Sequence, residues 1–277
     1  MNTSHQIKKS TQPSELRQAA LFWLAECHAV RKAEGVRLLA QVWLSGGMDL
    51  NTQSTLTAQQ TIPGHPPKPE LVRPLSVKRR AMNTPEGRAI LIHALAHIEF
   101  NAINLALDAI WRFADMPQEY YADWLQVADE EALHFSLLNG HLKDLGYEYG
   151  DYPAHNSLWE MAIKTQHDIL ARIALVPRTM EARGLDATPQ VRAKLVQAKD
   201  MAAAAIMDII LRDEIGHVAI GNRWYNWLCE QRGLEPITTY ARLATEYKAP
   251  AMRKPFNLKA RRAAGFSELE LAALISR

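Results

Sequence analysis

The 277-residue sequence has few cysteines, almost no net charge and no sign of a targeting segment. Its two cysteines, Cys27 and Cys229, exclude a multi-disulfide scaffold, and their scarcity fits a reducing compartment. A balance of 32 Lys and Arg against 30 Asp and Glu excludes nucleic-acid binding driven by net charge alone. We expect neither a secretory signal nor a membrane-spanning helix, which needs roughly 18 apolar residues in succession. The sequence therefore predicts a cytoplasmic protein.

A glycine-rich phosphate loop and a series of strands are also absent, and the pattern that remains is helical. With 48% apolar and 22% charged residues, the chain has the composition of a folded globular protein. Apolar spacing predicts one broken helix or two short helices from Ser14 to about Trp43. It also predicts four long helices, from about Gly87 to Phe113, Pro117 to Leu145, Ser157 to Ala182 and Asp200 to Arg232.

These patterns predict an all-α fold in four regions. The regions are an N-terminal helical region (1–47), a proline-rich arm (48–88), a four-helix bundle (89–232) and a C-terminal extension packed on the bundle (233–277). Six of the 14 prolines lie in the arm, and proline fixes φ and removes a backbone donor, so we expect an extended connection there.

Local signals predict where two of the helices end or begin. Gly184 is expected to stop the third long helix, with Thr188 and Pro189 as the cap and first residue of a short connecting helix. Ser267 and Glu270 have the spacing of a capping box, which predicts a last short helix.

Carboxylates inside apolar stripes are the most informative feature of the sequence. The helix face of Glu99 is otherwise apolar, and a lone ionised Glu buried there is costly unless it is paired or bound to a metal. Glu131 with His134, and Glu214 with His217, form two Glu-x-x-His pairs on faces of the same kind. The i, i+3 spacing places a carboxylate beside an imidazole, so both can bind one metal centre.

The separation of these residues predicts their depth in the fold. Glu99 and Glu131 have their midpoint at Asp115, on a predicted turn, so each lies about 16 residues, or roughly 24 Å, from the tip of a hairpin. The order Glu, then Glu-x-x-His, recurs if Glu181 is paired with Glu214. This arrangement is typical of dinuclear carboxylate sites in ferritin-like four-helix bundles.

The fourth carboxylate has two candidates. The midpoint of Glu181 and Glu214 lies near Gln197, so this pairing requires residues 183–199 to form an extra crossing segment. Glu160 is the alternative, because a plain hairpin ending at the predicted turn places it opposite Glu214. From spacing alone both remain candidates.

The ligand chemistry favours a pair of redox metals. Four carboxylates balance the charge of two divalent ions, and neutral imidazoles add donors without charge. Oxygen-rich ligands with one His per metal favour iron or manganese over structural zinc, although spacing does not separate iron from manganese.

Long segments of the chain resemble the ferritin-like superfamily and, within it, the DUF455 family. They include HALAHIEFNAINLALDAIW, VADEEALHFSLL, YPAHNSLWE, ALVPRTMEARGLDATP, RDEIGHVAIGNRWY and KPFNLKARRAAGF. The resemblance implies metal ligands at Glu99, Glu131, His134, Glu181, Glu214 and His217. The chain is more distantly similar to diiron tRNA hydroxylases, whose Glu-Ala-Arg run is like Glu181-Ala-Arg183; this likeness favours Glu181 over Glu160.

The resemblance also implies a function. It implies a non-haem diiron oxidoreductase that uses O₂ on an organic substrate, either a small molecule or a nucleotide, with an electron donor as partner. Glu131 and Glu214 would bridge the metals, and Glu99 and Glu181 would be terminal ligands. The alternative is metal handling, either iron oxidation and storage or dimanganese peroxide disproportionation.

Some further residues have candidate roles. Asp213, directly before Glu214, is a candidate to orient His134 by a hydrogen bond. His93 and His97 lie off the Glu99 face, and we expect hydrogen-bonded packing residues. Two basic clusters would bind nucleotide or RNA phosphates if they meet in space, and are otherwise solvated surface: Lys78-Arg79-Arg80, and Lys254 with Lys259, Arg261 and Arg262.

Overall fold

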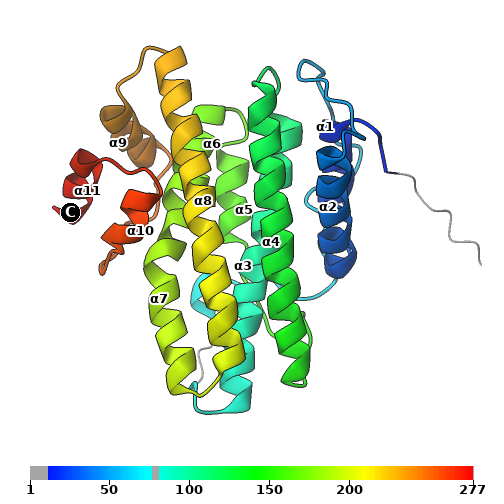
Figure 1. The fold of residues 1–277 in the computed structure, drawn as a ribbon, viewed down its shortest axis with the longest axis vertical. Helices are drawn as coiled ribbons and strands as arrows, with labels where there is room; N and C mark the ends of the chain where they lie inside the picture. The colour runs from blue at the N-terminus through cyan, green and yellow to red at the C-terminus, as the bar shows by residue number, and fades with distance from the viewer. Residues whose placement is uncertain (1–11, 77–80, 277) are drawn as a thin grey trace, which may run out of the picture.

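In the computed structural model, which describes residues 12–76 and 81–276, two long helical hairpins form the centre of the molecule (Figure 1). Helices α3 (Pro85–Arg112) and α4 (Gln118–Asp144) form the first, and α7 (Ala182–Gln197) and α8 (Met201–Gln231) form the second. The two hairpins pack together through α4 and α8.

Shorter helices surround the hairpins. Helices α1 (Leu16–Leu24) and α2 (Ala29–Leu44) pack on α3 and α4, on the side opposite α9 (Pro236–Glu246), α10 (Leu258–Ala263) and α11 (Glu268–Ile275) (Figure 1). The hairpins are connected by α5 (Ser157–Lys164), α6 (Ile169–Leu175) and a π-helical turn, η2 (Val176–Glu181). One 3₁₀ turn, η1 (Pro74–Ser76), lies in the proline-rich arm. Outside these helices the described residues form only isolated bridges, which confirms the all-α prediction.

Three of the four long helices begin and end within two residues of the predicted positions, because local caps mark their ends. Thr84 accepts a hydrogen bond from the Gly87 amide at the start of α3, and Asp200 accepts one from Ala203 at the start of α8. Asp115 has a positive φ in the turn between α3 and α4, where the midpoint of the first hairpin was predicted. The predicted capping box of Ser267 and Glu270 also starts α11.

The prediction for the third long helix is right at its start, Ser157, but wrong in its middle and at its end. The segment 157–182 is broken between α5 and α6, where Asp168 caps the new helix by accepting from the Leu170 amide. Gly184 does not stop the helix, and Thr188 and Pro189 do not begin another: α7 continues through them.

A distant side chain makes this continuation tolerable. Proline at position 189 cannot donate to the Leu185 carbonyl, which would be left without its helical partner. Asn257, from the segment before α10, donates its side-chain amide to the Leu185 carbonyl at 3.2 Å. Arg261 of α10 adds an ion pair to Asp186 at 2.6 Å. The C-terminal extension thus holds α7 as one helix.

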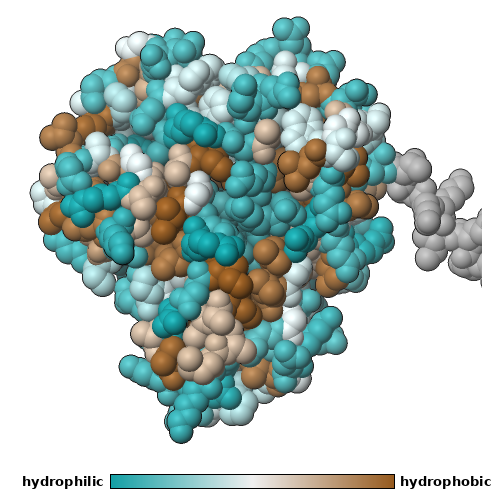
Figure 2. All heavy atoms as spheres, viewed as in Figure 1, coloured by the Kyte–Doolittle hydropathy of each residue, from teal (hydrophilic) through white to brown (hydrophobic). Residues whose placement is uncertain are grey.

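Helix α3 is the most membrane-like segment of the described residues. Among the described helices it alone is long and apolar enough to cross a membrane, yet 72% of its most apolar window is buried inside the protein. Figure 2 shows the face seen in Figure 1 as mainly hydrophilic, with small hydrophobic patches. This burial is what a core helix of a water-soluble protein shows.

Candidate metal centre

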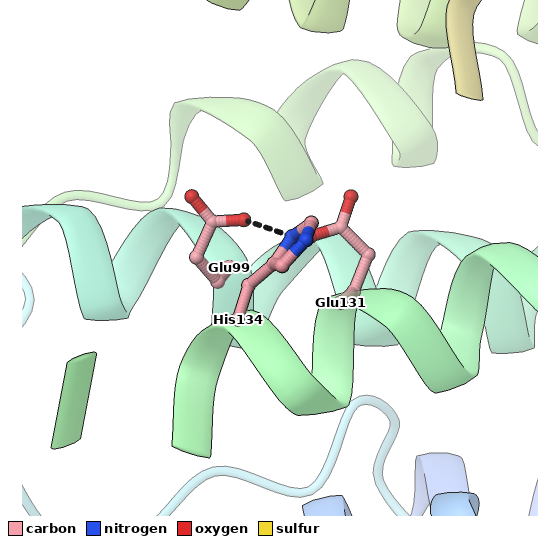
Figure 3. A group of neighbouring side chains, drawn as sticks. All are labelled: Glu99, Glu131 and His134. Carbon is pink, nitrogen blue, oxygen red and sulfur yellow. Dashed lines mark hydrogen bonds and ion pairs between the residues drawn. The ribbon is translucent and has the colours of Figure 1, made fainter. Parts of the chain in front are cut away.

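The first cluster of candidate ligands lies between α3 and α4. Glu99 on α3 and Glu131 and His134 on α4 are all buried. The Nδ1 of His134 lies 3.5 Å from Oε2 of Glu99 and 3.3 Å from Oε2 of Glu131. Both carboxylates turn toward the imidazole in Figure 3. This geometry brings together three donors within reach of one ion.

The second cluster lies between α4 and α8 and uses Glu131 again. The Nδ1 of His217 lies 3.1 Å from Oε1 of Glu131 and 4.0 Å from Oε2 of Glu214. Glu131 therefore directs one oxygen toward each histidine. The two imidazole ring centroids are 5.9 Å apart. A carboxylate placed in this way can bridge two metal ions.

Glu181 joins these residues, and Glu160 does not. Gln197, the predicted midpoint of Glu181 and Glu214, is the last residue of α7, so the second hairpin places Glu181 at the depth of Glu99 without an extra crossing segment. The Oε2 atom of Glu181 is buried. Glu160 is exposed on α5.

Unsatisfied polar atoms converge on this cluster. Of the nine buried side-chain nitrogen and oxygen atoms without a hydrogen bond in the described residues, five belong to it: Glu99 Oε2, Glu131 Oε1, Glu181 Oε2, Glu214 Oε2 and His217 Nδ1. Buried polar atoms without partners are costly, and native proteins have few of them. A set that converges on one point fits metal ligands, whose partner is the ion itself.

The pKa values show that the acids repel each other when no cation is present. Burial, followed by the charge of Glu131, raises the pKa of Glu99 and of Glu181 to about 8. The same two causes raise the pKa of Glu214 well above its ordinary value. Burial acts in the same direction on Glu131, but the hydrogen bond from His134 and the proximity of His217 outweigh it and hold its pKa below the ordinary range. Full ionisation of the four acids therefore requires added positive charge.

Two acids hold the imidazoles from the opposite hairpins. Nε2 of His134 on α4 donates to Oδ2 of Asp213 on α8 at 3.0 Å, and Nε2 of His217 on α8 donates to Oε2 of Glu130 on α4 at 2.7 Å. A proton fixed on Nε2 leaves Nδ1 free to bind a metal. Asp213 was predicted from the sequence and Glu130 was not, although an acid precedes the ligand Glu in both pairs.

A cavity of about 420 Å³ reaches the cluster from one side. Glu99, Glu181 and Glu214 line it, together with mainly apolar residues that include Leu95, Ile98, Ala102, Leu158, Met207 and Ile210. Its size is typical of small-molecule sites.

The histidines predicted to be packing residues are hydrogen-bonded inside the protein. His93 accepts from the Gly150 amide at 2.9 Å, and Nδ1 of His97 lies 2.8 Å from the Tyr149 hydroxyl. Neither belongs to the two buried clusters.

Only the second of the two basic clusters lies in the described residues, because Lys78, Arg79 and Arg80 lie outside them. In the second cluster, Arg261 is buried against Asp186. Arg262 is exposed and pairs with Glu268 at 2.6 Å, and Lys254 and Lys259 are also exposed. Phosphate binding by the two clusters together stays a prediction.

Comparisons with known proteins agree on the family. Residues 25–272 match the family described as "Protein of unknown function (DUF455)". A protein of Haemophilus influenzae (strain ATCC 51907 / DSM 11121 / KW20 / Rd), described as an uncharacterized protein, is 51% identical over 241 residues, which cover 84% of this chain and 83% of the relative. No solved structure matches the chain significantly. The chain therefore belongs to the DUF455 family.

Proposed function

We propose that this chain is a cytoplasmic, non-haem dinuclear-iron oxidoreductase, built on a ferritin-like four-helix bundle, that uses O₂ to hydroxylate or oxidise an organic substrate. The observation that carries the proposal is the position of Glu131, which belongs to both buried clusters and directs one oxygen toward each histidine. One shared carboxylate between two such clusters is what a dinuclear centre requires.

In this proposal each metal has one histidine and one terminal carboxylate. Glu99 and His134 would bind the first ion, Glu181 and His217 would bind the second, and Glu131 and Glu214 would be shared between them. Four carboxylates balance two divalent ions. Bound iron would supply the electrons that reduce O₂, and an electron donor would be needed to restore them.

The protein's own residues prepare the site for that chemistry. Asp213 and Glu130 hold the protons on Nε2 of the two histidines, so both Nδ1 atoms face the carboxylates. Glu131 and both imidazoles are fully buried, which excludes bulk water from their side of the centre. The cavity of about 420 Å³ leaves Glu99, Glu181 and Glu214 accessible to a molecule much larger than O₂. This space favours oxidation of an organic substrate over iron storage or peroxide disproportionation, neither of which needs it.

The metal content of the purified chain tests the proposal. The protein is loaded anaerobically with Fe(II), dialysed, assayed for metal and then exposed to O₂ while its absorbance is followed. We expect about two irons per chain, the stoichiometry of a dinuclear site, and an oxo-bridged ferric absorption band. Retention of manganese together with peroxide turnover would instead support the dimanganese alternative. Loss of all metal on dialysis would contradict the dinuclear site.

A further inference from the structure

The cavity beside the proposed metal centre has two arginines that lack partners. Nearly every arginine side chain in residues 12–76 and 81–276 makes a hydrogen bond or ion pair. Arg73, Arg183 and Arg253 are the exceptions in that part of the chain, and the last two line this one cavity. Asp186 also lines the cavity, but it is already paired with Arg261.

The cavity is polarised along its depth. At its inner end, Glu99 and Glu214 are only 3% and 7% exposed, whereas Arg183 and Arg253 are exposed at the surface. The wall contributed by α3 and α8 between these two ends is apolar, with Leu95, Ala102, Met207 and Ile210 among its residues. A molecule that fills this space therefore meets an apolar wall and two unpaired guanidinium groups at the entrance.

We propose that the cavity binds an amphipathic acid, with its apolar chain inside and its single carboxylate or phosphate on Arg183 and Arg253. The planar guanidinium forms paired hydrogen bonds with either anion. The two arginines hold the anionic head at the entrance, so the apolar end of the ligand extends toward Glu99 and Glu214. This inference rests on the proposed function for its chemistry, because it names the class of substrate whose chain end would be oxidised.

Binding of ten-carbon probes tests this inference without relying on turnover. Isothermal titration calorimetry compares decanoate, decyl phosphate, 1-decanol and decyltrimethylammonium, with the chain both metal-free and loaded with iron. We expect at least one of the two anions to bind tenfold or more tightly than decanol, and the cation not to bind. The better anion identifies the head group.

Matched variants locate the anionic head. The double variant Arg183→Gln/Arg253→Gln is expected to weaken anion binding by about tenfold or more, with decanol unchanged. Arg73→Gln, the third unpaired arginine, lies outside the cavity and should leave all affinities unchanged. Ala187 is exposed and lines the cavity, so Ala187→Trp should weaken the binding of decanol and of both anions.

Three results overturn the inference. These are equal affinity for decanol and the anions, no effect of the double arginine variant, and anion binding that requires iron but not the arginines. The last would mean that the head group binds the metal. Metal content is measured on the same samples, so that failure of the proposed function can be distinguished from failure of this inference. Arginine-dependent anion binding by a chain that retains no iron would contradict only the diiron proposal. A chain that retains two irons but binds no anion would contradict only this inference.

Discussion

The two hairpins carry equivalent acids on very different helices. Helices α3 and α4 are unbroken over 28 and 27 residues, and they bury Glu99, Glu131 and His134. In the second hairpin the approach to Glu181 is broken, π-helical and followed by Gly184 and a proline within α7. A π-helical turn often marks a functional site. The regular hairpin holds ligands away from water, and the irregular one leaves room beside them.

The cavity is lined from both hairpins, but α3 is the one helix of the regular hairpin that contributes to it among the described residues. Its lining comes from α3, α5, η2, α7, α8 and the segment before α10, and within the described residues α4 adds nothing to it. At Gly184 an added Cβ would already lie 3.9 Å from Cδ of Glu214, so the absence of a side chain leaves that carboxylate open to the cavity. The comparison indicates that helix irregularity here serves access, while both hairpins supply proposed metal ligands.

Substitution of Glu131, which lies on the regular hairpin, should have the largest effect on metal content. Glu131→Gln should leave less than one metal per chain, because Glu131 serves both clusters, whereas Glu181→Gln should retain at least one. Metal analysis after dialysis measures both. Glu160→Gln, which alters an exposed acid on α5, should retain two metals. Two metals in the Glu131 variant would remove the basis for a shared ligand.

The acids that hold the histidines should have the next largest effect. Loss of such an acid typically weakens metal binding by about 10- to 100-fold. Glu130→Gln should lower the metal affinity of the site that contains His217, and Asp213→Asn should lower that of the site that contains His134. Stepwise metal titration measures the two affinities separately. Asp208→Asn, at an exposed position on α8, is the control. Unchanged affinities in both variants would show that burial alone orients the imidazoles.

The pH dependence of metal binding compares Glu99 and Glu181, one from each hairpin. Both have a pKa of about 8 without metal, so below pH 8 each holds a proton that the ion must displace. Affinity should therefore rise with pH, by roughly tenfold per pH unit for each proton displaced. The part due to these two acids ends at about pH 8. Burial lowers the pKa of His134, but hydrogen bonds to Asp213 and the ligand acids outweigh burial and raise this pKa to about 12, so the rise continues above pH 8.

Calorimetry in buffers of different ionisation enthalpy counts the protons released. At pH 7 each of Glu99→Gln and Glu181→Gln should release about one proton fewer than the unaltered chain, because each lacks one acid that is protonated before binding. A proton count unchanged by either substitution would contradict the raised pKa of that residue.

Sequence alone predicted the three unbroken helices α3, α4 and α8 better than the segment between α4 and α8, for physical reasons. The ends of α3, α4 and α8 depend on caps and apolar periodicity within a few residues, such as Thr84 before Pro85. The inward acids of these helices were visible because each interrupts an apolar stripe. The course of α7 was not predictable in this way, since its tolerance of Pro189 depends on Asn257, 68 residues later. Glu130 could have been predicted in the same way as Asp213, because it directly precedes Glu131 as Asp213 precedes Glu214.

The smallest expected effect is on stability, and it concerns the contact by which Asn257 supports α7. Asn257→Ala removes both the cap of α10 and the donor to the Leu185 carbonyl, and should lower the free energy of unfolding by about 1–2 kcal/mol. Pro189→Ala restores a backbone N–H that can donate to the same carbonyl. In the Pro189→Ala variant, Asn257→Ala should therefore lower the free energy of unfolding by less. Chemical denaturation of the unaltered chain, the two single variants and the double variant measures the difference. Equal costs in both backgrounds would show that Asn257 acts only as a cap, and that α7 tolerates its proline without help from the C-terminal extension.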